Sequence, residues 1–145
     1  MEPIKVKKLK ENAILPTYGS AEAAGADLYA CLEGDVTIDP GKTAFIPTGL
    51  SMMIPVGTAG LIYARSGMAC KRGLAPANKV GVIDSDYRGE FIVVLHNHGD
   101  TTQTVCHGER IAQLVITPVF TPGFTEVKEL TESQRGAGGF GSTGK

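Results

Sequence analysis

The segments EFIVVLHNH (residues 90–98) and RIAQLVITPV (residues 110–119) are two nearly continuous apolar runs, interrupted by the turn signal Gly99-Asp100-Thr101. Runs of this length, rich in β-branched residues, are typical of strands that are covered on both faces by packed layers. The sequence therefore predicts that both segments are central strands of a β core.

Shorter segments around these two runs also have the periodicity of strands. Ile4–Lys7 and much of Leu50–Ile54 alternate between apolar and polar residues, which predicts half-buried strands. Val36–Ile38 and Thr43–Ile46 flank the turn-forming pair Pro40-Gly41. Nineteen glycines and eight prolines punctuate the chain, and no segment has the pattern of a long amphipathic helix. We therefore expect an all-β fold, a jelly-roll-like sandwich or barrel.

Length and composition predict one domain and limit its partners. The 145 residues are 42% hydrophobic, which suits a single β domain over residues 1–130 and a Gly-rich arm over residues 131–145. A net charge of -1 provides no general attraction to nucleic acid or to a membrane. The three cysteines have neither metal-ligand nor paired spacing, so no disulfide framework or zinc site is expected. No targeting signal is evident, and we expect a cytoplasmic protein.

The arm has two interpretations. Five glycines lie between Gly136 and Gly144, and Phe140 is the one large apolar side chain among them. Composition alone favours a disordered end, because such a segment cannot pack against itself. An aromatic ring flanked by glycines can instead stack on a flat ligand while the backbone N–H groups bind an anion.

Two short segments contain groups suited to phosphate chemistry. Arg65-Ser66-Gly67 follows an apolar strand and combines a guanidinium, a hydroxyl and an accessible backbone N–H, all of which bind phosphate oxygens. The segment Gly81–Glu90 concentrates charge between apolar strands. Asp84 there follows two apolar residues, so we expect it near the edge of the core, as a general base or a ligand of a hard cation. The alternatives are a surface turn and a solvated acidic loop.

Two further segments each place an ionic group in apolar surroundings. Asp27 lies within Ala24–Ala30 and Arg110 within Gly108–Gln113. For Arg110 we expect a structural ion pair rather than a ligand contact. Gln113 is a candidate donor to phosphate.

These segments, taken in order, resemble the five signature motifs of the trimeric dUTP diphosphatases. The matching segments are residues 24–30, 65–67, 81–90, 108–113 and 135–144. The resemblance implies a dUTPase-like jelly-roll homotrimer with three active sites at subunit interfaces. Two positions depart from the usual pattern: Ala64 replaces a common proline, and Ala137 replaces a hydroxyl or acidic residue. Neither position carries the chemistry.

The resemblance implies hydrolysis of dUTP to dUMP and pyrophosphate, a reaction that sanitises the nucleotide pool and supplies the precursor of dTTP. Asp84 matches the aspartate that activates the attacking water at the α-phosphorus, with Mg²⁺ bound to the triphosphate. Asp27 matches a position that contacts metal-bound water. The residues that match the phosphate-binding positions are Arg65, Ser66, Gly67 and Gln113.

Base and sugar recognition is likewise implied by the resemblance. A hairpin pocket would read uracil through backbone and amide hydrogen bonds, and Tyr87 would pack under the deoxyribose. The hairpin positions are Asn78, Gly81, Val82, Ile83 and Ile92. In the arm, Arg135 would contact the γ-phosphate and Phe140 would stack on uracil. Gly141 and Ser142 complete the expected substrate-binding set.

Two other functions remain open at this point. A dCTP deaminase-like enzyme would have a related trimeric fold but needs a glutamate in the pocket, where this chain has Asp84 and Tyr87. A non-catalytic trimer that senses nucleotide would need no general base. Products formed from dCTP and dUTP distinguish these possibilities.

Overall fold

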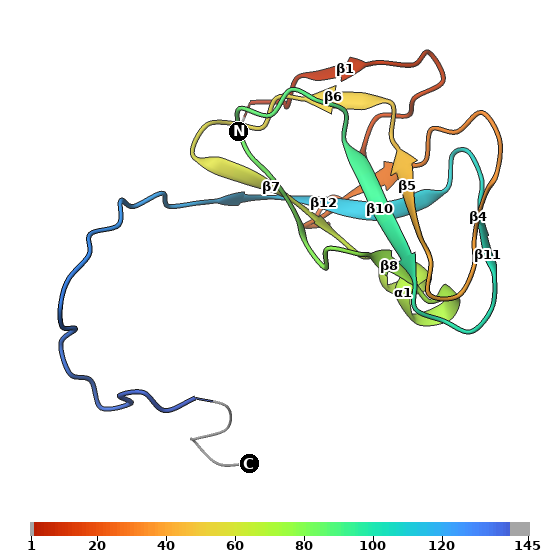
Figure 1. Ribbon diagram of the computed structural model, residues 1–145. Coiled ribbons are helices and arrows are strands. Elements are labelled where there is room, and N and C mark those ends of the chain that lie inside the picture. Colours follow the sequence, from red (N-terminus) through yellow and green to blue (C-terminus); the bar gives the residue numbers. More distant parts are fainter. Residues whose placement is uncertain (1, 140–145) are drawn as a thin grey trace.

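The computed structural model describes residues 2–139, and its strands confirm the all-β prediction. Within these residues there are twelve strands and one short helix. They form a β domain of four small sheets, from which the last strand runs on into an extended arm (Figure 1). No helix among the described residues is long and apolar enough to cross a membrane.

The largest sheet has five antiparallel strands with β12 at its centre. Its order is β2 (Thr17–Tyr18), β3 (Ala26–Tyr29), β12 (Arg110–Pro118), β7 (Thr58–Tyr63) and β9 (Gly81–Ile83). Within the nine residues of β12, Arg110–Leu114 pair with β3 and Gln113–Pro118 pair with β7. This strand therefore links segments that are far apart in the sequence.

Three smaller sheets complete the domain. One contains β5 (Thr43–Pro47), β10 (Ile92–Asn97) and β8 (Leu74–Pro76). The other two pair β1 (Val6–Lys8) with β6 (Leu50–Met52) and β4 (Val36–Ile38) with β11 (Gln103–Val105). Strands β4 and β5 flank the expected turn at Pro40-Gly41 but belong to different sheets.

The core receives side chains from all four sheets. The largest fully buried side chains are Phe91, Leu28, Ile38, Ile46, Leu50, Met52, Leu74, Leu95 and Ile111. The two runs expected to be central are strands β10 and β12, in separate sheets. The expectation that both faces are covered is wrong for β10, where buried and partly exposed residues alternate and Ile92 is exposed. The outer residues of this strand have no layer packed over them in the single chain.

One local prediction needs correction, and one segment is more regular than a turn. Strand β6 is buried throughout rather than half-buried, because Leu50 and Met52 enter the core while Ser51 donates a hydrogen bond to the Arg88 carbonyl. The segment Ser66–Arg72, at the start of which a surface turn was the alternative interpretation, forms helix α1, which agrees with the expectation that the chain has no long amphipathic helix. The helix is only seven residues long, too short to show a clear 3.6-residue period, and it ends at Gly73 in the left-handed conformation.

Asn97 is a fully buried polar residue that holds several chain segments together. Its amide nitrogen donates to the carbonyls of Ile38 and Thr101, both at 2.8 Å. Its amide oxygen accepts a hydrogen bond of 3.0 Å from the Gly99 nitrogen. Gly99 in turn lies so close to Gly73 that a Cβ at Gly73 would be 2.7 Å from the Gly99 nitrogen. Asn97 therefore anchors the loop against which the end of α1 packs.

The arm leaves the domain after β12 (Figure 1). Residues 119–139 have no regular strand or helix, and all of them are exposed. The boundary between domain and arm, expected at residue 131, remains a prediction, while regular structure ends at Pro118.

Replacing Asn97 with alanine should lower the free energy of unfolding by about 2–4 kcal/mol, because the buried Ile38 carbonyl and two partly buried backbone groups lose their partners and a fully buried side chain is truncated. Urea unfolding at a single protein concentration measures this change. Asp100→Ala, at an exposed position in the same loop, is the control and should change stability by less than about 0.5 kcal/mol. Equal midpoints for the two variants would contradict the anchoring role of Asn97.

Candidate functional site

The register of β12 brings three of the sequence motifs together. Gln113 pairs with Asp27 of β3 on one side and with Tyr63 of β7 on the other. Residues directly opposite each other in antiparallel strands project from the same face of the sheet. Arg65 follows Tyr63 by two residues, still in extended backbone, so it continues the same face. Asp27, Gln113 and Arg65 thus meet although they are distant in the sequence.

A β-bulge brings Arg110 to the same face. The register between β12 and β3 shifts between Arg110 and Ala112, so that Arg110 pairs with Tyr29 and Ala112 with Leu28. The extra residue, Ile111, is buried beside Ala112. Without the bulge, strict alternation would direct Arg110 to the face opposite Gln113, and a bulge re-aims a side chain in this way.

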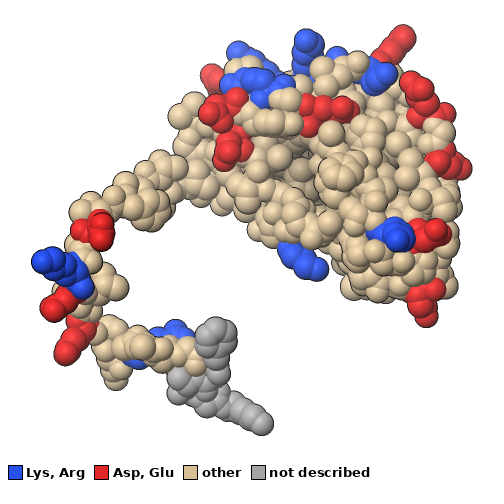
Figure 2. Space-filling view, viewed as in Figure 1, with Lys and Arg blue, Asp and Glu red and all other residues tan. Residues whose placement is uncertain are grey.

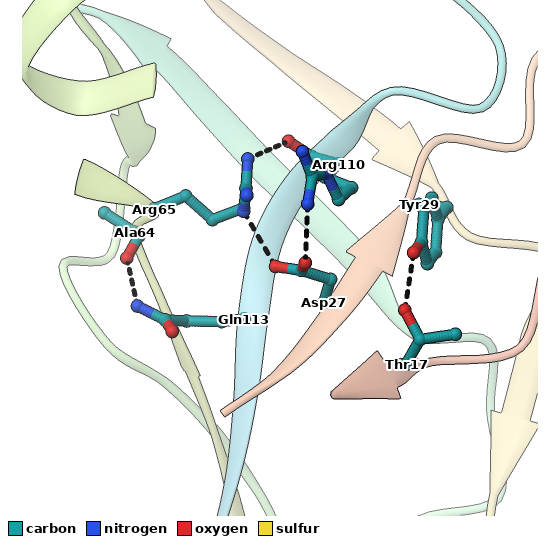
Figure 3. A network of polar contacts seen from close by, with 7 residues as sticks. All are labelled: Thr17, Asp27, Tyr29, Ala64, Arg65, Arg110 and Gln113. Atoms are coloured by element: carbon teal, nitrogen blue, oxygen red, sulfur yellow. Dashed lines mark hydrogen bonds and ion pairs between the residues drawn. The ribbon is translucent and has the colours of Figure 1, made fainter. Parts of the chain in front are cut away.

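Asp27 forms ion pairs with two arginines, which point toward it from either side (Figure 3). Its Oδ1 accepts a hydrogen bond of 2.7 Å from Arg65 Nε, and its Oδ2 lies 3.3 Å from Arg110 Nη1. The Asp27 side chain is 13% exposed, and both arginines are more open to solvent. The structural ion pair expected for Arg110 is present. One carboxylate orients two guanidinium groups, each of which retains N–H donors for another anion.

Gln113 is held by two constraints. Its Nε2 donates to the carbonyl oxygen of Ala64 at 2.9 Å (Figure 3). Its side chain also covers Gly25, where a Cβ would lie 2.7 Å from Gln113 Oε1. The Gln113 amide occupies the space that a side chain at position 25 would need, so this position requires glycine. The backbone before Arg65 is linked to the central strand through the same hydrogen bond.

These side chains line a pocket of about 430 Å³. Its walls are formed by Gly19, Ala23, Gly25, Asp27, Arg65, Ser66, Gly67 and Gln113. Ser66 and Gly67 are exposed at the start of α1, so a hydroxyl and backbone N–H groups accompany the arginine. This combination can bind phosphate groups. Sequence reasoning missed Gly19 and Ala23, because small residues in an irregular segment carry no chemical signal.

Helix α1 is fixed at its other end by Arg72. The Arg72 guanidinium donates to Gln103 Oε1 at 3.1 Å and to Glu109 Oε1 at 3.2 Å, and it also reaches the carbonyl of Thr104 at 2.5 Å. Glu109 immediately precedes β12. The helix that presents Ser66 and Gly67 is thus attached to the strand that presents Gln113.

A second group of expected site residues lies around β9. Gly81, Val82 and Ile83 form that strand, and Asn78 lies exposed in the turn before it. Ile92 begins β10 in another sheet and is also exposed. Tyr87 is 42% exposed, and its hydroxyl donates to the Glu90 carbonyl at 3.0 Å. Of these residues, Val82 and Ile92 present apolar side chains to solvent, while Gly81 is buried.

Asp84 directly follows β9 and is exposed. The expected position near the edge of the core is met by the neighbouring Ile83, which packs against the core, whereas Asp84 lies beyond the strand and is exposed in the single chain. Gly60 of β7 pairs with Ile83, so Asp84 lies near the start of β7 while Arg65 follows its end. The five residue steps from Gly60 to Arg65 span about 17 Å of extended chain.

The arm residues are separate from both groups. Arg135 is exposed, and its Nε donates to the Gly138 carbonyl at 2.9 Å within the arm. It does not line the pocket of Arg65. Phe140, Gly141 and Ser142 lie outside the described residues. The view in Figure 2 shows charged side chains mainly along the rim of the β domain and on the arm, with uncharged surface between them.

The buried Cys31 has the features of a structural cysteine rather than a nucleophile. All three are free, and Cys31 is buried while Cys70 is exposed. Burial raises the pKa of the Cys31 thiol above its ordinary value, and the nearby Glu90 carboxylate raises it further. A thiol with a raised pKa is a poor nucleophile at neutral pH.

Comparison with known proteins agrees with the motif pattern. The family model described as dUTPase matches residues 11–144. A deoxyuridine 5'-triphosphate nucleotidohydrolase of Syntrophotalea carbinolica is 50% identical over 97% of this chain and 96% of its own length. The enzyme of the same name from Janthinobacterium sp. is 49% identical over 100% of this chain and 99% of its own length.

Solved structures extend the likeness to three dimensions. The dUTPase of Staphylococcus bacteriophage 80alpha, solved with dUPNHPP, superposes with a TM-score of 0.92 at 30% identity, covering 100% of both chains. The dUTPase of phage phi11 of S. aureus superposes with a TM-score of 0.81 at 28% identity, covering 89% of this chain. The fold, the ordered motifs and these matches together lead to one conclusion: the chain belongs to the dUTPase family.

Proposed function

We propose that this protein hydrolyses dUTP to dUMP and pyrophosphate, and so removes dUTP from the nucleotide pool while supplying the precursor of dTTP. The observation that carries the proposal is the pocket in which Arg65, Ser66, Gly67 and Gln113 converge. Its groups suit a polyphosphate, and relatives about 50% identical are named for action on deoxyuridine 5'-triphosphate. The phage relative was solved with the nucleotide analogue dUPNHPP.

The phosphate chain would lie against Arg65 and the start of α1. Phosphoryl transfer requires mostly positioning and charge stabilisation from the protein. The Asp27 carboxylate orients the Arg65 guanidinium, and the hydrogen bond from Gln113 to Ala64 fixes the segment before it. Contacts that fix the donor groups in this way keep the reorganisation on binding small.

The water-activating role falls to Asp84, in the same position relative to the motif as in the family. A general base must come within hydrogen-bond reach of the water that attacks the α-phosphorus. In one chain, however, the pocket at Arg65 and the carboxylate of Asp84 lie toward opposite ends of β7. The proposal therefore includes a homotrimer, in which Asp84 of one subunit meets Arg65 of another.

The separation of base-reading and phosphate-binding residues supports the same arrangement. Gly81, Val82, Ile83 and Tyr87 would bind uracil and deoxyribose on the Asp84 side. Hydrogen bonds from a fixed backbone to the uracil edge would reject cytosine, since a mismatched edge leaves buried polar groups unpaired. A subunit interface would also supply the desolvation that Asp84 lacks in the single chain.

The residues present fit a magnesium ion that is held mainly by the nucleotide. Among residues 2–139, no cluster of three His, Cys, Asp or Glu side chains could hold a metal ion by itself. Mg²⁺ commonly keeps several waters and binds through substrate phosphates and one or two carboxylates. Asp27 is the carboxylate beside the pocket and would reach the ion through a bound water. When bound, the ion neutralises charge on the triphosphate.

The arm would complete the site of a neighbouring subunit. Phe120 and Phe124 are 95% and 100% exposed, which is costly for aromatic side chains in a lone chain. Burial against another subunit would remove that cost and direct the following residues toward its nucleotide. Arg135 would then contact the γ-phosphate, and Phe140, Gly141 and Ser142 would close over the base.

The defining experiment is release of pyrophosphate from dUTP, measured with and without Mg²⁺. We expect dUMP and pyrophosphate in equal amounts, and much slower release after chelation of Mg²⁺. Incubation with dCTP separates the alternative, because a deaminase would produce a uridine nucleotide without pyrophosphate. Nucleotide binding without any product would instead indicate a non-catalytic sensor.

Asp84→Asn should lower kcat for dUTP by about 10²- to 10⁴-fold, because the amide cannot accept the proton of the attacking water. Binding of dUTP, measured by calorimetry with the variant, should remain close to that of the wild-type protein. Asp100→Asn, which removes an exposed carboxylate elsewhere, is the matched control and should leave kcat unchanged. Normal turnover by Asp84→Asn would remove this residue from the mechanism.

Deletion of residues 135–145 should leave the domain folded, because the described residues of this segment make no contact with the core. The value of kcat/KM for dUTP should fall by about tenfold or more, since base stacking alone contributes about 1–3 kcal/mol. Thermal unfolding and steady-state kinetics measure the two effects. Lys128→Ala, an exposed substitution earlier in the arm, serves as the control. Full activity of the truncated chain would mean that the arm is not part of the site.

A further inference from the structure

Gly89 lies under the side chain of Tyr87. A Cβ at position 89 would be 2.3 Å from the Tyr87 hydroxyl oxygen, 2.5 Å from Cζ and 2.9 Å from Cε2. The backbone of Gly89 is not in the left-handed region, so its conformation does not itself require glycine. The close approach of the tyrosine ring is therefore what excludes a side chain there.

The Tyr87 side chain is held by a hydrogen bond from its hydroxyl and by an aromatic contact of its ring. Its hydroxyl donates to the carbonyl of Glu90 at 3.0 Å, so the side chain crosses Gly89 and returns to the main chain. Its ring centroid lies 6.1 Å from that of Phe91, at an interplanar angle of 44°. Phe91 is fully buried and its nitrogen donates to the Leu50 carbonyl at 2.8 Å. The ring thus rests on a rigid part of the domain.

The loop around the ring is held by hydrogen bonds that do not involve the ring. Tyr87 N donates to the Asp84 carbonyl at 3.2 Å, and Arg88 Nη1 donates to the Ser85 carbonyl at 2.7 Å. Ser51 Oγ donates to the Arg88 carbonyl at 2.7 Å. A methyl group at position 89 would therefore displace the ring while these bonds keep the loop in place.

We propose that Gly89 is a positioning residue for sugar specificity: the missing side chain lets the Tyr87 ring lie flat against the backbone, where it can exclude a ribose 2'-hydroxyl. This inference rests on the proposed function, in which Tyr87 packs under the deoxyribose. Gly89 acts through Tyr87 and does not touch the nucleotide. Displacement of the ring by even about 1 Å alters a close-packed surface enough to change selectivity.

The test compares kcat/KM for dUTP with kcat/KM for UTP, measured as pyrophosphate release by the full chain with Mg²⁺. Gly89→Ala should lower this ratio by about tenfold or more. Gly34→Ala is the matched control, because Gly34 is exposed, has no atom within 4 Å of an added Cβ and has an ordinary backbone conformation. Its ratio should equal that of the wild-type protein.

A second background shows whether Gly89 acts through the ring. In Tyr87→Ala protein the added methyl group meets no ring, so Gly89→Ala should cause no further loss of selectivity. If Gly89→Ala does not fold, the double variant should fold, since the clash has been removed. An unchanged ratio in folded Gly89→Ala would overturn the inference. So would a double variant that does not fold, or one that is less selective than Tyr87→Ala alone.

The proposed function can fail independently of this inference. If the wild-type protein releases no pyrophosphate from dUTP, the proposed activity is wrong. If it hydrolyses dUTP but does not discriminate against UTP, the activity stands and the role assigned to Gly89 and Tyr87 is overturned.

Discussion

The antiparallel register of β12 between β3 and β7 is the constraint on which the candidate site depends. It sets Gln113 beside Asp27 and Tyr63, and so determines which side chains share a face. A one-residue slip would exchange the inner and outer faces of the strand. Ala112 and Leu114, which lie in the core, would then face outward, so burial of the core and assembly of the pocket require the same register.

The pocket is held together by contacts among the protein's own side chains and backbone. The Asp27 carboxylate holds Arg65 and Arg110, Gln113 ties the preceding segment to the central strand, and Arg72 secures the far end of the helix. Placing charged groups in such a network costs desolvation energy, which apolar side chains packed at the same positions would avoid. The value of the network lies in fixed guanidinium positions, because a charged ligand then meets donors that need not reorganise.

Much of the fold and the composition of the site were predictable from the sequence. Strand β10 follows from the apolar run after Glu90, and the motif segments named from the sequence contain Arg65, Ser66, Gly67 and Gln113, which line one pocket. Helix α1 was missed because seven residues are too few for a helical period to show. The exposure of Asp84 was also missed, since hydrophobic neighbours in sequence do not show whether another element covers a strand end.

By itself the sequence determined the all-β class and the family, because alternating strands, turn residues and ordered motifs are local properties of the chain. Only the tertiary structure decided that the bulge at Ile111 turns Arg110 toward Asp27, and that the Tyr87 ring occupies the space above Gly89. It also decided that Asp84 and Arg65 lie toward opposite ends of β7. These relations depend on register and close packing between side chains and strands, which no local pattern encodes.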